Sequence, residues 1–191
     1  MSKIIGIIGG IASGKSTVAQ FLKGLGANVL DADLENAALL LEPDYIAKVS
    51  ALAPSCVHDG AIDKDALRSW MLRSDANYTA LIQLAHPILR ERITAQTQGN
   101  GLYFIELSAY YPDFMPLDEV WMVVAPPEVC IRRVMQRNGW PREQVERIIK
   151  RQTKMLNNVE PDVVLQNSEG MAELFKLAEA AFYKALVRYI Q

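Results

Sequence analysis

The sequence predicts an α/β fold with a five-stranded, mostly parallel sheet. Short runs of β-branched and other apolar residues alternate along the chain with amphipathic stretches of helical spacing. These runs are apolar throughout, which is typical of strands buried on both faces of a parallel sheet. The 191 residues suit one domain over 1–191, or one domain that carries an inserted subdomain.

The first 33 residues are predicted to form a βαβ unit. The β-branched run Ile4–Ile8 indicates a buried strand, and a glycine-rich turn joins it to a helix over Ser16–Lys23. Ala27–Leu30 indicates a second strand. We expect this strand to place Asp31 and Asp33 at its carboxyl end.

The next stretch is longer than one crossover helix requires. Its spacing is helical and amphipathic, with interruptions near Pro43 and Pro54 and at His86-Pro87. An inserted helical subdomain that binds substrate is therefore predicted at 34–98. The pair His86-Pro87 is expected to form a bend with a partly buried histidine.

Three more strands and their helices complete the predicted sheet. The strands are expected at Leu102–Ile105, Val120–Val124 and Asp162–Leu165. One helix begins near Glu128, and the last covers Ala172–Tyr189. Ligands on such sheets bind beyond the carboxyl ends of the strands, so functional residues are expected at that edge.

One motif carries specific chemistry. Residues Gly9–Ser16 fit the pattern G-x-x-x-x-G-K-S/T at every fixed position, and Thr17 follows. Glycines let the backbone curl until successive N–H groups face phosphate oxygens, and the following helix turns its positive end to the same anion. The motif lies between a predicted strand and a helix. We therefore predict a three-layer P-loop NTPase fold that binds ATP.

The motif also predicts roles for single residues. Lys15 places a positive charge on the outer phosphates, and the Ser16 hydroxyl is the predicted ligand of Mg²⁺. The expected nucleotide-binding residues of the loop are Gly10, Ile11, Ala12, Ser13, Gly14, Lys15, Ser16 and Thr17.

Acidic residues follow two of the predicted strands. A kinase that acts on a hydroxyl gains from a carboxylate that accepts the proton, and Asp31 and Asp33 are placed for that role. An aspartate in this position also suits an ordinary turn or helix cap. Glu106, at the end of the third strand, is either a holder of metal-bound water or a plain strand terminus.

The segment 128–155 is rich in basic residues and is predicted to form a helical lid. Such a face is usually solvated, but arginines on a lid can stabilise a transferring phosphoryl group and exclude water. Arg133 and Arg137 are four residues apart and share a helix face. Gly139-Trp140-Pro141 supplies a bend within the lid.

The composition indicates a cytoplasmic protein without nucleic-acid or membrane partners. The formal net charge is -2, and no apolar stretch is long enough for a membrane span. Cys56 and Cys130 lie far apart without metal-ligand spacing, as expected of reduced thiols.

The chain resembles the dephospho-coenzyme A kinase family from one end to the other. The residues that carry the resemblance are Gly9–Thr17, Leu25-Gly26, Val29–Asp33, His86-Pro87, Arg133, Arg137, Arg142, Arg147, Gln152, Asp162 and Asn167. The resemblance implies transfer of a phosphoryl group from ATP, with Mg²⁺, to the ribose 3′-hydroxyl of dephospho-coenzyme A, the last step of coenzyme A biosynthesis. It also implies a small-molecule substrate. For the assembly, we expect a monomer or small homo-oligomer.

The resemblance implies roles for residues outside the loop as well. Asp33 is the expected general base, and Arg133 and Arg137 are expected to act in catalysis with Lys15. Two further residues are expected at the nucleotide, namely Arg142 and Asn167. Substrate binding is assigned to Asp33, His86 and Arg90.

The chain departs from the family pattern at two places. Ala37 stands where an arginine is usual, and Ser108–Pro112 replaces a Pro-Leu-Leu run that an acidic residue follows. Both departures fall where the acceptor is expected to bind. A kinase for another hydroxyl compound, such as a nucleoside or sugar, and a catalytically weak nucleotide-binding homologue therefore stay open as alternatives.

Overall fold

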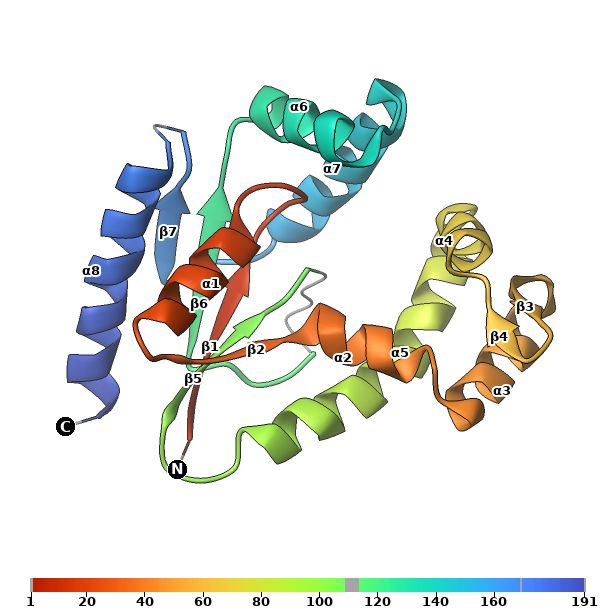
Figure 1. Cartoon of the computed structure of the whole chain (residues 1–191), viewed down its shortest axis with the longest axis horizontal. Coiled ribbons are helices and arrows are strands. Elements are labelled where there is room, and N and C mark those ends of the chain that lie inside the picture. The colour runs from red at the N-terminus through yellow and green to blue at the C-terminus, as the bar shows by residue number, and fades with distance from the viewer. Residues whose placement is uncertain (1, 109–113, 169, 191) are drawn as a thin grey trace. The chain divides into compact units, whose positions relative to one another are not determined.

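The computed structural model describes residues 2–108, 114–168 and 170–190. The chain forms two compact units (Figure 1). We call Met1–Asp31 with Thr97–Gln191 the core unit, and Ala32–Gln96 the inserted unit. Across the described residues, no helix combines the length and the apolar character that crossing a membrane requires.

The core unit contains a five-stranded sheet in the order β2-β5-β1-β6-β7. Every pairing in it is parallel. The strands are β1 (Lys3–Ile8), β2 (Asn28–Asp31), β5 (Leu102–Glu106), β6 (Glu119–Val124) and β7 (Val163–Gln166). The predicted α/β fold with a five-stranded parallel sheet is thus confirmed.

The described residues of the core unit form four helices. They are α1 (Lys15–Gly24), α6 (Pro127–Asn138), α7 (Arg142–Leu156) and α8 (Met171–Tyr189). The break between α6 and α7 falls on Gly139-Trp140-Pro141, where the sequence predicts a bend. Gly139 ends α6 in the left-handed conformation, with φ 67°.

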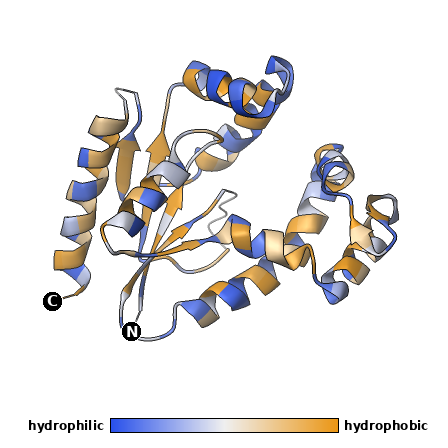
Figure 2. Cartoon of the chain, in the orientation of Figure 1, coloured by the Kyte–Doolittle hydropathy of each residue, from blue (hydrophilic) through white to orange (hydrophobic). Residues whose placement is uncertain are grey.

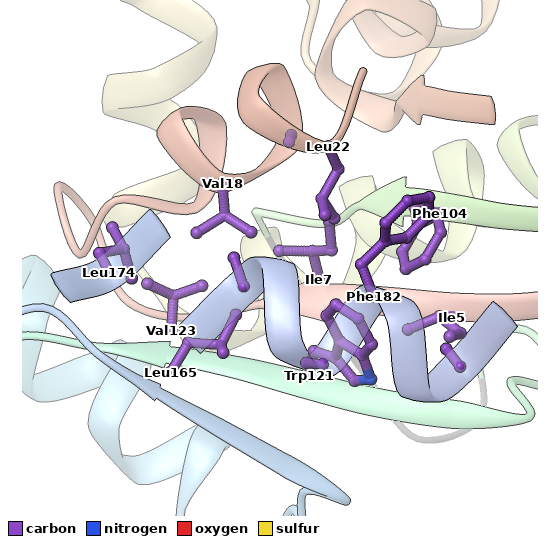
Figure 3. Close-up of a cluster of buried hydrophobic side chains, with 14 of the residues drawn as sticks. Ile5, Ile7, Val18, Leu22, Phe104, Trp121, Val123, Leu165, Leu174 and Phe182 are labelled. Carbon is purple, nitrogen blue, oxygen red and sulfur yellow. The ribbon is translucent and has the colours of Figure 1, made fainter. Parts of the chain in front are cut away.

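The main hydrophobic core lies between the sheet and the pair α1 and α8. Figure 3 shows Val18 and Leu22 of α1 and Phe182 of α8 against the sheet residues Phe104 and Trp121. The rings of Phe104 and Trp121 meet edge to face, with centroids 5.2 Å apart. The central strands β1, β5 and β6 are mostly apolar in Figure 2, as burial on both faces requires.

A buried carboxylate fixes the end of α8 to the start of β6. Glu119 accepts hydrogen bonds from Trp121 Nε1 at 2.9 Å and from the Tyr189 hydroxyl at 3.1 Å, and it forms an ion pair with Arg188. The buried carboxylate thus has hydrogen-bond and ion-pair partners, without which its burial would be costly.

The inserted unit is mainly helical. Its elements are α2 (Ala32–Leu39), α3 (Pro43–Leu52), the 3₁₀ turn η1 (Pro54–Cys56), β3 (Val57–His58), β4 (Ala61–Ile62), α4 (Lys64–Leu72) and α5 (Asp75–Gln96). Polar contacts hold α5 to the neighbouring helices: Arg92 pairs with Glu42, the residue before α3, and Gln96 Nε2 donates to Glu35 Oε1 of α2 at 2.7 Å.

The small sheet of the inserted unit was not predicted. β3 and β4 form an antiparallel pair around Asp59-Gly60, whose φ angles of 50° and 74° are typical of a tight hairpin turn. The Asp-Gly pair was the available signal. Strands of two residues are too short to show an alternating pattern, which is why the sequence pattern here indicates helix alone.

The predicted bend at His86-Pro87 is wrong, because α5 continues through Pro87. A proline inside a helix removes the hydrogen bond to the carbonyl four residues earlier. That carbonyl belongs to Gln83, which is exposed, so water can replace the lost N–H group. Packing of α5 against α2, α3 and α4 stabilises the continuous helix.

Candidate active site

The phosphate loop joins the end of β1 to the first turn of α1, and two of its glycines have no room for a side chain. A Cβ atom on Gly9 would lie 2.3 Å from the carbonyl oxygen of Val123. One on Gly14, which has φ 112°, would lie 2.4 Å from Asn167 Nδ2. Glycine is therefore required at both positions by backbone conformation and by close approach.

Replacement of Gly14 by alanine is expected to weaken ATP binding by about tenfold or more, since the loop must move to accommodate the Cβ atom. The matched control is Gly24→Ala, because no atom lies within 4 Å of a Cβ at that position on the same helix. The control should bind ATP normally and gain up to about 1 kcal/mol in free energy of unfolding. Titration calorimetry with ATP compares the two variants. Equal affinities for ATP would contradict the requirement for glycine at position 14.

Lys15 is enclosed by the loop that precedes it. Its ammonium donates to the carbonyl oxygens of Gly9 at 3.0 Å and Gly10 at 3.1 Å, and the residue is only 6% exposed. The positive charge is thus held within the curl of the loop. Electrostatic interactions are stronger there than at the surface, because little water screens them.

Glu106 lies beside the predicted metal ligand. The Ser16 hydroxyl donates to Glu106 Oε1 at 2.5 Å, although the two residues are 90 positions apart. Glu106 is 5% exposed and is the register partner of Asp31 on the neighbouring strand. Glu106, whose role the sequence leaves open, therefore lies next to Ser16.

The oxygens of Ser16 and Glu106 fit a magnesium ion bound with a nucleotide. Mg²⁺ prefers hard oxygen ligands, and it usually takes only one or two from protein while phosphates and water complete its shell. Among the described residues, no group of three or more His, Cys, Asp or Glu side chains could hold a metal ion without such help.

Asn167, at the end of β7, supports the loop from inside the protein. Its side chain is 4% exposed, its Nδ2 donates to the Ser13 carbonyl at 2.7 Å, and its Oδ1 accepts from Arg133 at 3.4 Å. Arg133 also donates to the Ala12 carbonyl at 3.1 Å. Asn167 and Arg133 therefore brace the same part of the loop.

Exchange of Asn167 for aspartate is expected to lower the free energy of unfolding by about 1–3 kcal/mol. The carboxylate would face the Ser13 carbonyl with no donor between them, and Arg133 would offset only part of the cost. Urea denaturation measures the loss. Asn158→Asp, at an exposed position after α7, is the control and should stay within about 0.5 kcal/mol of the parent protein.

The predicted lid packs on the phosphate loop. Ile131 and Val134 of α6 and Val145 of α7 form a buried cluster, against which Ile11 and Ala12 of the loop pack. Movement of α6 and α7 must therefore disturb these contacts with the loop.

The other predicted lid arginines have different partners. Arg137 is exposed and donates from Nε to Asn138 Oδ1 at 2.7 Å. Arg142 forms ion pairs with Glu128 at 2.5 Å and with Glu146 at 2.7 Å. These contacts are within the lid, whereas Arg133 reaches the loop.

Gln152 was missed as a site residue. Its Oε1 accepts the backbone N–H of Ile11 at 2.7 Å. It also lines a small hollow with Gly9 and Ser108; the other lining residues are Leu107, Met155 and Leu156. A glutamine on a basic helix has no distinguishing local pattern, and its place in the family resemblance was the one available signal.

The predicted acceptor-binding residues belong to the inserted unit. Asp33 is exposed in the first turn of α2, where the positive helix end favours an acidic residue. His86 and Arg90 are one turn apart on α5. Burial lowers the pKa of His86, and the charge of Arg90 lowers it further, so the imidazole is neutral at neutral pH. A positive charge for an anionic acceptor would come from Arg90.

The two departures from the family pattern lie in different places. Ala37 is half-buried on α2, one turn after Asp33. Of the segment 108–112, Ser108 borders the hollow beside Gly9, and 109–112 lies outside the described residues.

Comparisons with known proteins agree over nearly the whole chain. A family model described as dephospho-CoA kinase matches residues 3–173. The dephospho-CoA kinase of Geobacter sulfurreducens is 34% identical over 193 residues, which cover 95% of this chain and 98% of the relative. That of Ralstonia nicotianae is 34% identical over 191 residues, which cover 90% of this chain and 93% of the relative.

Solved structures share the fold. A crystal structure of a Thermus thermophilus protein is 30% identical, with a TM-score of 0.78, and the match covers 97% of this chain and 98% of the other. The structure of dephospho-CoA kinase from Campylobacter jejuni is 20% identical, with a TM-score of 0.60, and the match covers 96% of this chain and 97% of the other. At this identity the likeness shows the fold alone. By the family model and by its relatives above 30% identity, the chain belongs to the dephospho-CoA kinase family.

Proposed function

We propose that this protein transfers the γ-phosphoryl group of ATP to the ribose 3′-hydroxyl of dephospho-coenzyme A, which yields coenzyme A and ADP. The observation that carries the proposal is the complete phosphate loop, with the ammonium of Lys15 enclosed and the hydroxyl of Ser16 next to Glu106, in a member of this family.

The loop and α1 bind and orient the phosphates. Inward N–H groups and the positive end of α1 hold the anion, and Lys15 compensates charge on the outer phosphates. Ser16 and Glu106 would hold Mg²⁺, the latter through water, and the ion supplies further charge neutralisation. Because phosphoryl transfer requires mainly positioning and charge stabilisation, these residues supply most of the rate enhancement.

The hydroxyl of the acceptor attacks the γ-phosphorus while the bond to the bridging oxygen of ADP breaks. We assign Asp33 as the base that takes the hydroxyl proton, and Arg133 and Arg137 as residues that stabilise charge on the transferring group. Arg142 and Asn167 are proposed at the nucleotide, Asn167 through its support of the loop. His86 and Arg90 are proposed to bind the acceptor.

We place the enzyme in the cytoplasm, as a monomer or small homo-oligomer whose partner is the small-molecule acceptor. The formal net charge of -2 supports the choice of a small-molecule partner, because it offers no general attraction to nucleic acid or to an anionic membrane surface.

Steady-state ADP release tests the function. The assay contains ATP, Mg²⁺ and dephospho-coenzyme A, with a parallel panel of nucleosides and sugars, and Lys15→Ala serves as the blank. Turnover confined to dephospho-coenzyme A is the expected result, and it would mean that Ala37 and the segment 108–112 are tolerated variation. Turnover with another acceptor alone, or ATP binding without turnover, would overturn the substrate assignment.

A further inference from the structure

The phosphate loop contains one residue in a conformation that its side chain disfavours. Ala12 has φ 56°, in the left-handed region that residues with a Cβ atom seldom occupy. Such a conformation persists only where the surroundings hold it in place. The contacts around Ala12 therefore decide whether the loop keeps its shape before a nucleotide arrives.

Two side chains of the lid hold the backbone on either side of that strained position. On the amino side, Gln152 Oε1 of α7 accepts the N–H of Ile11 at 2.7 Å. On the carboxyl side, Arg133 of α6 donates to the Ala12 carbonyl at 3.1 Å. Ile11 and Ala12 also pack against the buried cluster of the lid.

The hydrogen bond from the Ile11 N–H to Gln152 Oε1 involves a group of the kind that binds phosphate. A phosphate loop binds anions with its N–H groups, and a side-chain oxygen that accepts one of these groups fixes the direction in which that peptide points. Gln152 also lines the hollow next to Gly9. Its amide is therefore at the surface of the site rather than in the distant core.

We propose that Gln152 is a positioning residue for nucleotide binding, which holds the Ile11 peptide so that the loop is formed before ATP binds. Pre-formation stabilises the ground state and the transition state of the bound nucleotide equally. Loss of the bond should thus raise KM for ATP and leave kcat nearly unchanged. The proposal rests on the proposed function only in taking ATP as the ligand.

Gln152→Met keeps the length of the side chain and removes the acceptor. The control is Gln136→Met, which makes the same exchange at an exposed position on α6. Titration calorimetry with ATP and with ADP, in the absence of any acceptor, should show Kd raised by about three- to tenfold for Gln152→Met and unchanged for the control. Because no acceptor is present, the measurement is independent of which hydroxyl compound is phosphorylated.

Hydrogen exchange at the Ile11 amide, followed by NMR, separates positioning from a general structural role. Exchange of this amide should be faster in Gln152→Met. The exchange rates of amides in β1 and β5, and the Tm, should stay as in the parent protein. Gln152→Glu retains an acceptor oxygen, so slow exchange at Ile11 should be preserved in that variant.

Two results would overturn the proposal. One is a Kd for ATP in Gln152→Met equal to that of the Gln136→Met control. The other is faster exchange throughout β1 and β5 with a lowered Tm, which would identify Gln152 as a residue of general stability. If instead nucleotide binding behaves as expected and dephospho-coenzyme A is not phosphorylated, the proposed function fails and the role of Gln152 stands.

Discussion

Lys15→Ala is expected to lower kcat by about 10²- to 10³-fold, the typical effect of losing one preorganised charge that stabilises a transition state. The ammonium lies within the loop, 3.0 Å from the Gly9 carbonyl and 3.1 Å from that of Gly10, where water screens it little. Without it, charge on the outer phosphates goes uncompensated. Single-turnover transfer from ATP, at saturating ATP and acceptor, measures the effect on the chemical step.

Lys23→Ala is the matched control for this variant. Lys23 is on the same helix, exposed in its last turn, and its loss should change the transfer rate by less than about twofold. Unfolding curves of both variants verify that the loop and α1 remain folded. A transfer rate for Lys15→Ala equal to that of the control would refute the assigned role.

Asp33→Asn is expected to lower kcat by about 10²-fold or more while ATP still binds, because asparagine cannot accept the proton of the attacking hydroxyl. The exchange preserves the size of the side chain and removes only its charge in the first turn of α2. Steady-state kinetics with varied acceptor, together with calorimetry for ATP, measure the two effects separately.

Asp44→Asn is the control for the aspartate. Asp44 is also exposed and also in the first turn of a helix of the inserted unit, so the exchange removes the same charge in the same local setting. Its turnover should match that of the parent protein. Near-normal turnover of Asp33→Asn would mean that another group takes the proton, and Asp31, the register partner of Glu106, would be the next residue to test.

The sequence by itself determined the features that depend on local spacing. The β-branched run of β1 and the pattern from Gly9 to Ser16 predict a strand, a phosphate loop and a helix, because each is specified by residues that are neighbours along the chain. Gly139-Trp140-Pro141 likewise predicts the break between α6 and α7. Gly139 takes the left-handed conformation that ends α6, and Pro141 directly precedes α7.

The tertiary structure alone decided the contacts that complete the site. Glu106 pairs with Ser16 from 90 positions away, and Gln152 accepts the Ile11 N–H from 141 positions away. Gln152 has no local signature, and the place of Glu106 at the end of a strand leaves its role open. Packing also overrode a local rule where α5 continues through Pro87. The physical reason is the same in each case. These hydrogen bonds and the continuous helix depend on atoms that only the fold brings together, and a local sequence pattern does not show which distant residues will become neighbours.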